Sequence, residues 1–491
     1  MRCSGILLPV ASLPSKYGIG CFSREAYEFV DQLARAGQKI WQILPLGPTG
    51  YGASPYQSFS TFAGNACFID LEKLVEEGLL TREECESFSY GTDPQYVDYD
   101  KVEESRDVLL RKAYSRFNPE EDFGDFVREN GFWLEDYALY MAFKGSHEGE
   151  PWTEWEEELR DRHPGPIQNE RMKLADEIQY YRFVQYKFYQ QWDRLKQYAN
   201  DRQIQIIGDM PIYVSFDSAD AWSNPLLFQF NEKNQPIAVA GCPPDYFAPK
   251  GQLWGNPLYS WEYHRETGYS WWISRMQHSL RLYDVVRIDH FRGFDEYYSV
   301  PFGEETAEFG HWEKGPGLEL FRALQEKVEN LQVIAEDLGF LTESVIQLVK
   351  DTGYPGMKVL EFAFDSDPTC LYLPHNIPQN SIIYTGTHDN DTLAGWIRTM
   401  PPHADRYARQ YLDYHGHDEK EYIWKFIRLA IASVAQRAVI PMQDYLCLGS
   451  EARINVPSTV GENWKWRLLK GQFTDELADR IRELSGIYGR L

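Results

Sequence analysis

The sequence contains few cysteines and no pattern that would pair them. The seven cysteines are scattered and odd in number, and none is spaced as Cys-x-x-Cys. Such a set predicts neither a disulfide framework nor a zinc site. It fits a reducing compartment, and we expect a cytoplasmic protein.

Long apolar runs are also missing from the sequence. No stretch approaches the roughly 18 to 20 apolar residues that a membrane-spanning helix needs. The first apolar segment is short, is interrupted by Pro9 and lacks a small-x-small cleavage pattern. We therefore interpret residues 5–10 as a strand and not as a signal peptide, and we expect no membrane partner.

Positive charge is scarce relative to negative charge. The chain has 49 Lys and Arg against 74 Asp and Glu, which gives a net charge of −25. This charge repels phosphate backbones and anionic lipids, so we expect no nucleic-acid partner. A neutral polyhydroxyl ligand carries no such penalty.

Aromatic residues are abundant, at 15% of the chain, with 15 Trp, 32 Tyr and 27 Phe. These rings have two interpretations that composition does not separate. They can fill a large core, or some of them can stack on an uncharged, ring-shaped ligand such as a sugar.

One stretch combines a buried strand with charges at its end. Val285, Val286 and Ile288 are typical of a strand that is covered on both faces. Side chains alternate along a strand, so Arg287 and Asp289 project to the same side. Taken alone, this pair could be a structural ion pair.

Three further apolar runs end in acids. Glu336 follows the run at 331–335, Asp389 follows the run at 381–385, and Asp209 follows the run at 203–208. The C-terminal ends of strands in a (β/α)8 barrel meet on one face, where such enzymes place catalytic residues. The four acids are therefore predicted to meet at one mouth.

The count of expected strands agrees with an α/β fold of the (β/α)8 TIM barrel class. The eight segments are residues 5–10, 38–45, 203–208, 284–289, 331–335, 356–362, 381–385 and 438–444. We expect one catalytic barrel over residues 1–491, with large inserted subdomains and no C-terminal β domain. A mostly helical insertion is predicted over 72–200 and a smaller one over 222–275.

Two irregular segments are expected to border the mouth. Residues 47–58 form a loop by their turn signals and contain Tyr51, Ser54 and Tyr56, although a surface loop with incidental tyrosines is the alternative. Residues 241–257 are rich in Gly and Pro. We expect them to be a lid without regular structure, with rings at Tyr246, Phe247 and Trp254.

Several stretches resemble one known family. The stretches around Arg287-Ile288-Asp289-His290, Glu336-Asp337 and Thr387-His388-Asp389-Asn390 are similar to those of the α-amylase superfamily. Within it, the whole chain resembles the amylomaltase family of 4-α-glucanotransferases. The more specific matches are residues 51–60, 208–214, 243–247, 254–257, 452–455 and 463–467.

The resemblance implies roles for individual residues. Asp289 would be the nucleophile, Glu336 the general acid/base, and Asp389 the second aspartate, which grips the hydroxyls of the sugar in the −1 subsite. The expected substrate contacts are Tyr51, Ser54, Tyr56, Asp209, Tyr246, Phe247, Trp254, Arg287, His290 and His388. No metal, pyridoxal phosphate or nucleotide sugar is implied. Ala53 departs from the Asp that relatives often carry, which bears on loop polarity.

The chemistry implied is cleavage of an α-1,4 bond with retention. It needs two carboxyl groups about 5–5.5 Å apart, one as nucleophile and one as acid. We expect Arg287 to keep Asp289 ionised and neighbouring carboxylates to raise the pKa of Glu336. A lid that excludes water would favour transfer to a sugar 4-OH. The expected donors and acceptors are α-1,4-glucans, maltooligosaccharides and glucose.

Two alternatives remain open at this stage. A hydrolase of the α-amylase type would use the same three acids and differ only in its acceptor. A glucan-binding barrel without catalysis is the second, although the intact acid trio argues against it. The sequence makes no prediction about the oligomeric state.

Overall fold

A closed barrel of eight parallel strands lies at the centre of the computed structural model, which describes residues 2–119, 121–244, 249–339 and 341–491. The strands follow one another around the barrel in the order β1-β12-β11-β10-β9-β6-β3-β2. Their bounds are β1 (Cys3–Leu7), β2 (Ile40–Gln42), β3 (Gln205–Met210), β6 (Val285–Ile288), β9 (Val333–Ala335), β10 (Gly356–Val359), β11 (Ser381–Tyr384) and β12 (Arg437–Pro441).

Each of the eight predicted strand segments contains or overlaps one barrel strand, so the predicted fold class is confirmed. The ends differ by a few residues. β1 stops at Leu7 because Pro9, which has no N–H to donate, leads into a short 3₁₀ turn at Val10–Ser12. β12 stops at Pro441, where α18 (Met442–Tyr445) begins.

The barrel interior is an apolar core that the strands line with alternate residues. Leu7, Ile207, Val285, Ile334 and Met357 belong to this inner cluster. Val286 and Ile288 belong instead to the outer cluster between strands and helices. The alternation predicted for the strand at 284–289 is confirmed, and it places Arg287 on the inner side with Val285.

Helices surround the barrel and pack on one another in sequence order. The covering helices are α1 (Arg24–Arg35), α9 (Ala175–Asp201), α12 (Ser270–Leu282), α13 (Leu318–Lys327), α14 (Glu343–Thr352), α17 (Glu419–Ala432) and α19 (Asp475–Ile487). Neighbours in this ring contact one another, except that α14 and α17 are separated by the segment around β10 and β11. Turns, and no α-helix, connect β10 to β11 over the described residues 360–380.

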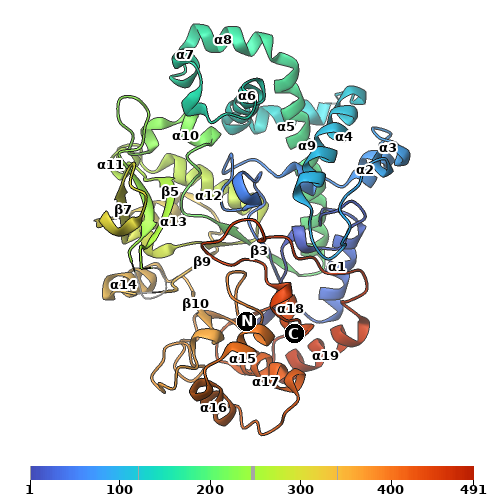
Figure 1. Ribbon diagram of the computed structural model, residues 1–491, viewed down its shortest axis with the longest axis vertical. Coiled ribbons are helices and arrows are strands. Elements are labelled where there is room, and N and C mark those ends of the chain that lie inside the picture. The colour runs from blue at the N-terminus through green and yellow to red at the C-terminus, as the bar shows by residue number, and fades with distance from the viewer. Residues whose placement is uncertain (1, 120, 245–248, 340) are drawn as a thin grey trace.

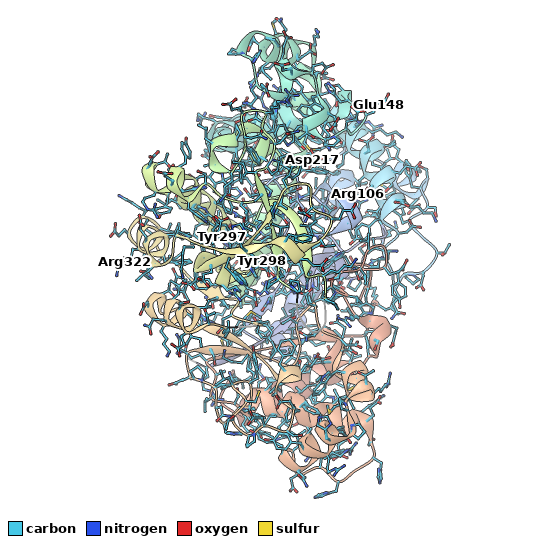
Figure 2. The ribbon with its side chains drawn as sticks, turned by 60° about the vertical axis from the view of Figure 1, so that its left-hand side comes forward. Arg106, Glu148, Asp217, Tyr297, Tyr298 and Arg322 are labelled. Carbon is cyan, nitrogen blue, oxygen red and sulfur yellow. The ribbon has the colours of Figure 1, made fainter. Side chains whose placement is uncertain are left out.

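A long helical segment separates β2 from β3 and rises above the barrel (Figure 1). It contains α2 (Leu71–Glu76), α3 (Arg82–Glu86), α4 (Tyr99–Arg116), α5 (Glu121–Glu129), α6 (Gly131–Ser146), α7 (Glu157–Arg160) and α8 (Pro164–Lys173), and it leads into α9. Lys144 on α6 pairs with Asp217 at 2.6 Å. Asp217, which Figure 2 labels, also accepts a hydrogen bond from Tyr140 at 2.5 Å, so the loop after β3 is tied to α6.

A second sheet of four antiparallel strands lies beside the barrel, in the order β5-β4-β7-β8. Its strands are β4 (Ala238–Cys242), β5 (Gln252–Pro257), β7 (Glu296–Pro301) and β8 (His311–Lys314). The sheet therefore uses residues from both sides of β6. In Figure 2 this side of the molecule is turned forward, with Tyr297 and Tyr298 of β7 labelled.

The prediction that residues 241–257 lack regular structure was wrong at both ends of the segment, and its first two residues, Gly241 and Cys242, belong to β4. Residues 252–257 form β5, an edge strand, in spite of Gly255 at φ +76° and Pro257. An edge strand tolerates both residues, and its pairing with β4 contains a register shift between Val239 and Gly241. The rings of Tyr246 and Phe247 lie outside the described residues.

The C-terminal part adds helices only. After β12, the described residues form α18, a 3₁₀ turn at Ser450–Ala452 and α19, with no further strand. This agrees with the predicted lack of a C-terminal β domain. Within the part of the chain that the structure describes, no helix combines the length and apolar character that crossing a membrane requires.

Candidate active site

Arg287 lies at the base of the candidate site and bridges two acids. The β3–β6 register places it directly opposite Asp209. Its Nη1 donates to both Asp209 carboxylate oxygens at 2.7 Å and to Oδ1 of Asp289 at 3.0 Å. The Arg287 and Asp209 side chains are 3% and 0% exposed, so each charge is buried and needs the other.

Asp289 follows β6 directly and opens onto a cleft. Burial raises the pKa of Asp289 to about 6, and the negative charges of Asp209 and Asp389 act in the same direction. The positive charge of Arg287 opposes them. Arg287 lowers the pKa of Asp289, as expected, but the loss of solvation on burial raises this pKa by more.

Glu336, at the end of β9, is held by two backbone N–H groups. That of His290 donates to Oε2 at 2.7 Å, and that of Leu338 donates to Oε1 at 2.9 Å. His290 has a left-handed φ of 51°, a conformation often found in functional turns. Since His290 follows Asp289, this contact brings the acids at the ends of β6 and β9 together.

Burial also raises the pKa of Glu336, to about 7, opposed by the charge of Arg287. The negative charge of Asp289 raises this pKa further, while the two N–H donors lower it. The pKa of Glu336 is thus raised, which is the direction predicted for an acid beside a nucleophile.

Asp389 has the opposite electrostatic environment. Burial works to raise its pKa, but the charge and hydrogen bond of His388 and the amide of Asn455 lower it well below the usual value. His388 Nε2 lies 3.3 Å from Oδ2, and Asn455 Nδ2 donates to Oδ1 at 2.7 Å. Asp389 is thus held as a carboxylate.

Tyr56 connects the two sides of the site. Its hydroxyl donates to Oδ2 of Asp209 at 2.7 Å and lies 2.8 Å from Nε2 of His388. Because the hydroxyl proton goes to Asp209, the imidazole N–H is the donor in the second contact. The two rings also stack, with centroids 5.4 Å apart.

Asp289 and Asp389 line a cleft of about 630 Å³, whereas Glu336 is not among the residues that line it. Of the predicted residues, the cleft is lined by Ser54, Tyr56, Trp254, Asp289, His290 and Asp389. The Trp254 ring meets the edge of the His290 ring at 4.8 Å, so the small sheet forms one wall. Arg287, Asp209 and His388 lie buried behind this surface.

Three predicted contacts are not placed at the site. Tyr246 and Phe247 lie outside the described residues, and of Tyr51 only its position in a 3₁₀ turn at Tyr51–Ala53 is described. Two residues that were not assigned roles do reach the site. Asn455 contacts the Asp389 carboxylate, and Arg453 donates to the Asp389 carbonyl at 2.7 Å. Both come from the stretch 452–455, whose family resemblance was the available signal.

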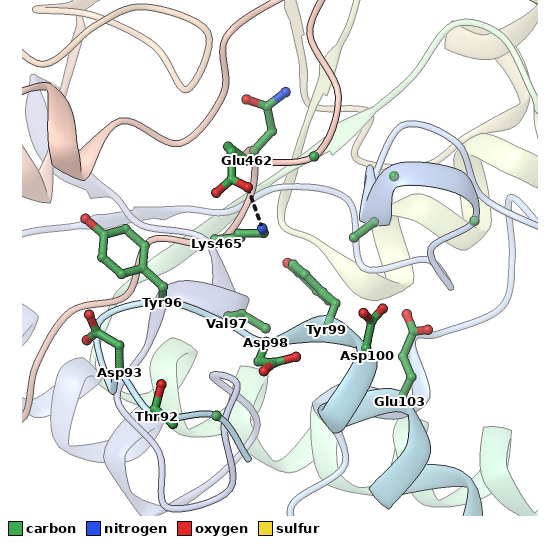
Figure 3. Close-up of a pocket in the computed structure, with 16 residues that line it drawn as sticks. Thr92, Asp93, Tyr96, Val97, Asp98, Tyr99, Asp100, Glu103, Glu462 and Lys465 are labelled. Carbon is green, nitrogen blue, oxygen red and sulfur yellow. Dashed lines mark ion pairs between the residues drawn. The ribbon is translucent and has the colours of Figure 1, made fainter. Parts of the chain in front are cut away.

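A second groove, of about 690 Å³, adjoins the cleft and shares Gly52 and Asn463 with it. Figure 3 shows Tyr96, which precedes α4, and Tyr99, which begins it, together with the Glu462–Lys465 ion pair of the C-terminal loop. Tyr99 donates to the carbonyl of Trp464 at 2.8 Å, which ties the groove wall to the C-terminal loop.

The arrangement is suited to acid-assisted displacement at a sugar carbon. It offers a carboxylate nucleophile, a carboxylic acid with a pKa near neutrality, and a third acid that stays ionised. Among the described residues, no group of three or more His, Cys, Asp or Glu side chains is placed to hold a metal ion.

Comparisons with known proteins agree with this chemistry. The family model described as 4-alpha-glucanotransferase matches residues 8–472. A 4-alpha-glucanotransferase from Clostridium butyricum is 48% identical, with 98% of this chain and 99% of the relative covered. One from Thermus thermophilus is 46% identical over 100% of this chain and 99% of the relative.

A solved structure is also very similar. The amylomaltase from Streptococcus agalactiae, in complex with acarbose, superposes with a TM-score of 0.97 at 42% identity and covers 100% of both chains. The amylomaltase from Corynebacterium glutamicum, at 17% identity and a TM-score of 0.79, shares the fold over 99% of this chain and 75% of its own. The resemblance seen in the sequence is confirmed, and the chain belongs to the 4-alpha-glucanotransferase family.

Proposed function

We propose that Asp289 and Glu336 carry out the family's transfer reaction with retention at the anomeric carbon. Asp289 attacks the anomeric carbon of an α-1,4-linked glucose while Glu336 protonates the departing oxygen. The bond to the leaving sugar breaks as the Asp289–carbon bond forms. The observation that supports the proposal is the hydrogen bond to Glu336 from the backbone N–H of His290, the residue that follows Asp289.

The pKa values support this division of roles. Burial and the charge of Asp289 raise the pKa of Glu336, which favours its protonated form, while the charge of Arg287 works to lower the pKa of Asp289 and favours its ionised form. After the first step, the ionised Glu336 becomes the base that takes a proton from the acceptor hydroxyl. The same group therefore acts in both half-reactions.

Asp389 and its neighbours are proposed to hold the sugar in the −1 subsite. A permanent carboxylate accepts hydrogen bonds from two sugar hydroxyls and stabilises positive charge that develops at the ring. His290 adds a second polar group, because burial lowers its pKa to about 3 and its Nε2 has no hydrogen-bond partner among the described residues. A neutral imidazole of this kind suits a sugar hydroxyl.

The acceptor determines whether transfer or hydrolysis follows. We propose that Trp254 and the segment 241–257 cover the acceptor side and orient an incoming glucan or glucose 4-OH. Tyr246 and Phe247 remain predicted contacts of this lid. Tyr51 remains a predicted glucan contact, beside the groove that Gly50, Gly52 and Ala53 line.

The division of the chain into subdomains is likewise a proposal, with the bounds predicted from the sequence. Residues 72–200 form a helical subdomain and residues 222–275 a small subdomain on a single catalytic barrel over 1–491. A cytoplasmic location is still a prediction from the cysteine pattern.

A product ladder from maltotriose tests the proposal. Transfer yields glucose together with maltopentaose and longer oligomers, whereas a hydrolase yields only shorter sugars. Asp289→Ala should fold normally and lose turnover. Glu336→Gln, given an α-maltosyl donor whose leaving group needs no protonation and then quenched with acid, should carry a maltosyl mass adduct on Asp289. Inversion of the anomeric configuration in the first product would exclude the mechanism.

A further inference from the structure

A separate cavity lies away from the acid cluster, between the helical insertion and the small-sheet side of the barrel. It measures about 310 Å³, within the range of small-molecule sites. Its walls come from α6, α10 (Ala219–Ser223), α11 (Trp261–Glu266) and the start of α12. None of the residues discussed for catalysis lines it.

Aromatic rings form one side of this cavity. Phe132 on α6 is 59% exposed. Exposing a phenyl ring to water is unfavourable, and a polar side chain at this position would avoid that cost. It packs edge-on against Phe62 at 5.6 Å, which fixes its position, and Trp271 meets Phe62 at 6.5 Å. Rings held in place by their neighbours offer a flat surface without a large entropy loss on binding.

Polar groups that carry no positive charge form the other side. The described lining residues include Asp136, Asp220, Ser223 and Asn224, and neither Lys nor Arg, although Arg162 pairs with Asp136 at 2.6 Å from outside the lining. The Asp220 carboxylate is fixed by the Thr61 backbone N–H at 2.8 Å and hydroxyl at 2.9 Å. Such a lining disfavours phosphate and carboxylate ligands and suits a neutral ligand with hydroxyls on its edge and C–H groups on its face.

The cavity opens on the same side of the barrel as the catalytic cleft. In the loop after β2, Tyr56 lines the cleft and Ser60, four residues later, lines the cavity. In the segment after β3, Tyr213 lines the cleft and Ala219 lines the cavity. A polymer held at the cleft can therefore extend toward the cavity.

We propose that this cavity, defined by Phe132, Trp271 and Asp220, is an anchoring site for a pyranose ring of a long α-glucan chain. The proposal deepens the substrate class of the transferase. Occupation of a second site by the same polymer makes binding partly intramolecular, so it benefits long chains and leaves short oligomers unaffected.

The test compares Phe132→Ala with a matched variant, Phe309→Ala. Phe309 is 67% exposed, lies in the 3₁₀ turn at Ala307–Phe309 beyond β7 and lines neither the cleft nor the cavity. We expect Phe132→Ala to raise KM for long amylose about three- to tenfold, because one aromatic contact with the glucan is lost. kcat, and kcat/KM for maltotriose, should stay at the wild-type value. Phe132→Trp should restore the low KM for amylose.

Direct binding provides a second readout. In an Asp289→Ala background, native gels that contain amylopectin should retard Phe309→Ala strongly and Phe132→Ala less. Equal retardation and equal KM for amylose in the two variants would overturn the anchoring site. A Phe132→Ala variant whose activity on maltotriose falls as much as its activity on amylose would also overturn it. A wild-type enzyme that hydrolyses maltotriose without forming longer oligomers would instead refute the proposed reaction.

Discussion

Asn455 donates its side-chain N–H to Oδ1 of Asp389 at 2.7 Å, and its backbone N–H donates to the carbonyl of His388 at 3.1 Å. One residue from a loop after β12 thus fixes two residues that follow β11. The contact also helps lower the pKa of Asp389, which keeps that carboxylate charged beside the sugar.

Replacing Asn455 should therefore impair catalysis more than folding. Asn455→Ala removes a hydrogen bond to a charged group, worth about 1.5–3 kcal/mol, so kcat/KM for maltotriose should fall about ten- to a hundredfold. Asn380→Ala is the control, because Asn380 is exposed and precedes β11 at the opposite end of the barrel. Equal activity of the two variants would mean that Asp389 is positioned without Asn455.

The Tyr56 hydroxyl is the second contact that can be removed alone. Tyr56→Phe keeps the ring stacked on His388 but takes away the proton donated to Asp209. A buried carboxylate then loses one partner and keeps Arg287, so we expect a roughly tenfold loss in kcat/KM. Thermal melts should show the fold intact. If activity is unchanged, the stacked ring and not the hydroxyl is what the site requires.

The dependence of activity on pH follows from the two raised pKa values. Below about 6, Asp289 takes up a proton and can no longer attack; above about 7, Glu336 loses the proton that the leaving oxygen needs. We expect a narrow bell-shaped profile of kcat/KM, whose limbs report the coupled pair. The measurement uses maltotriose at constant ionic strength. A profile that stays flat from pH 5 to 9 would contradict this assignment of the acid and the nucleophile.

The barrel was predictable because each strand is a local signal. The run at 331–335 is apolar and β-branched and ends in carboxylates, and the same pattern recurs at 381–385. The acids could be assigned to one mouth because parallel barrel strands share a direction. Neither inference depends on contacts between distant residues.

The parts that sequence did not reveal depend on distant partners. β5 contains Gly255 and Pro257 and becomes a strand only because β4 pairs with it. Glu296–Pro301 and His311–Lys314, the strands β7 and β8, form the rest of that sheet and have too little apolar alternation to be recognised alone. Asn455 reaches Asp389 through the path of a loop, which no periodicity encodes.

Glu361 is a half-buried acid outside the catalytic trio, and it allows a last prediction about stability. It follows β10, and its buried Oε1 has no hydrogen-bond partner within the part of the chain that the structure describes. Burial raises its pKa well above the usual value, and the negative charges of Asp444 and Asp391 add to this shift. Arg453 and Asn390 oppose it only in part.

The sign of the effect follows from proton linkage. The folded state keeps the Glu361 proton at pH values where the unfolded chain has released it, so raising the pH favours unfolding. Glu361→Gln has nearly the same shape and no proton to lose. We expect its melting temperature to equal that of the wild type near pH 4 and to exceed it by about 1–3 °C at pH 8. Glu462→Gln, at a side chain that is 93% exposed, should shift neither value. A Glu361→Gln variant that melts below the wild type at pH 8 would mean that the ionised carboxylate is needed, with Arg453 as its partner.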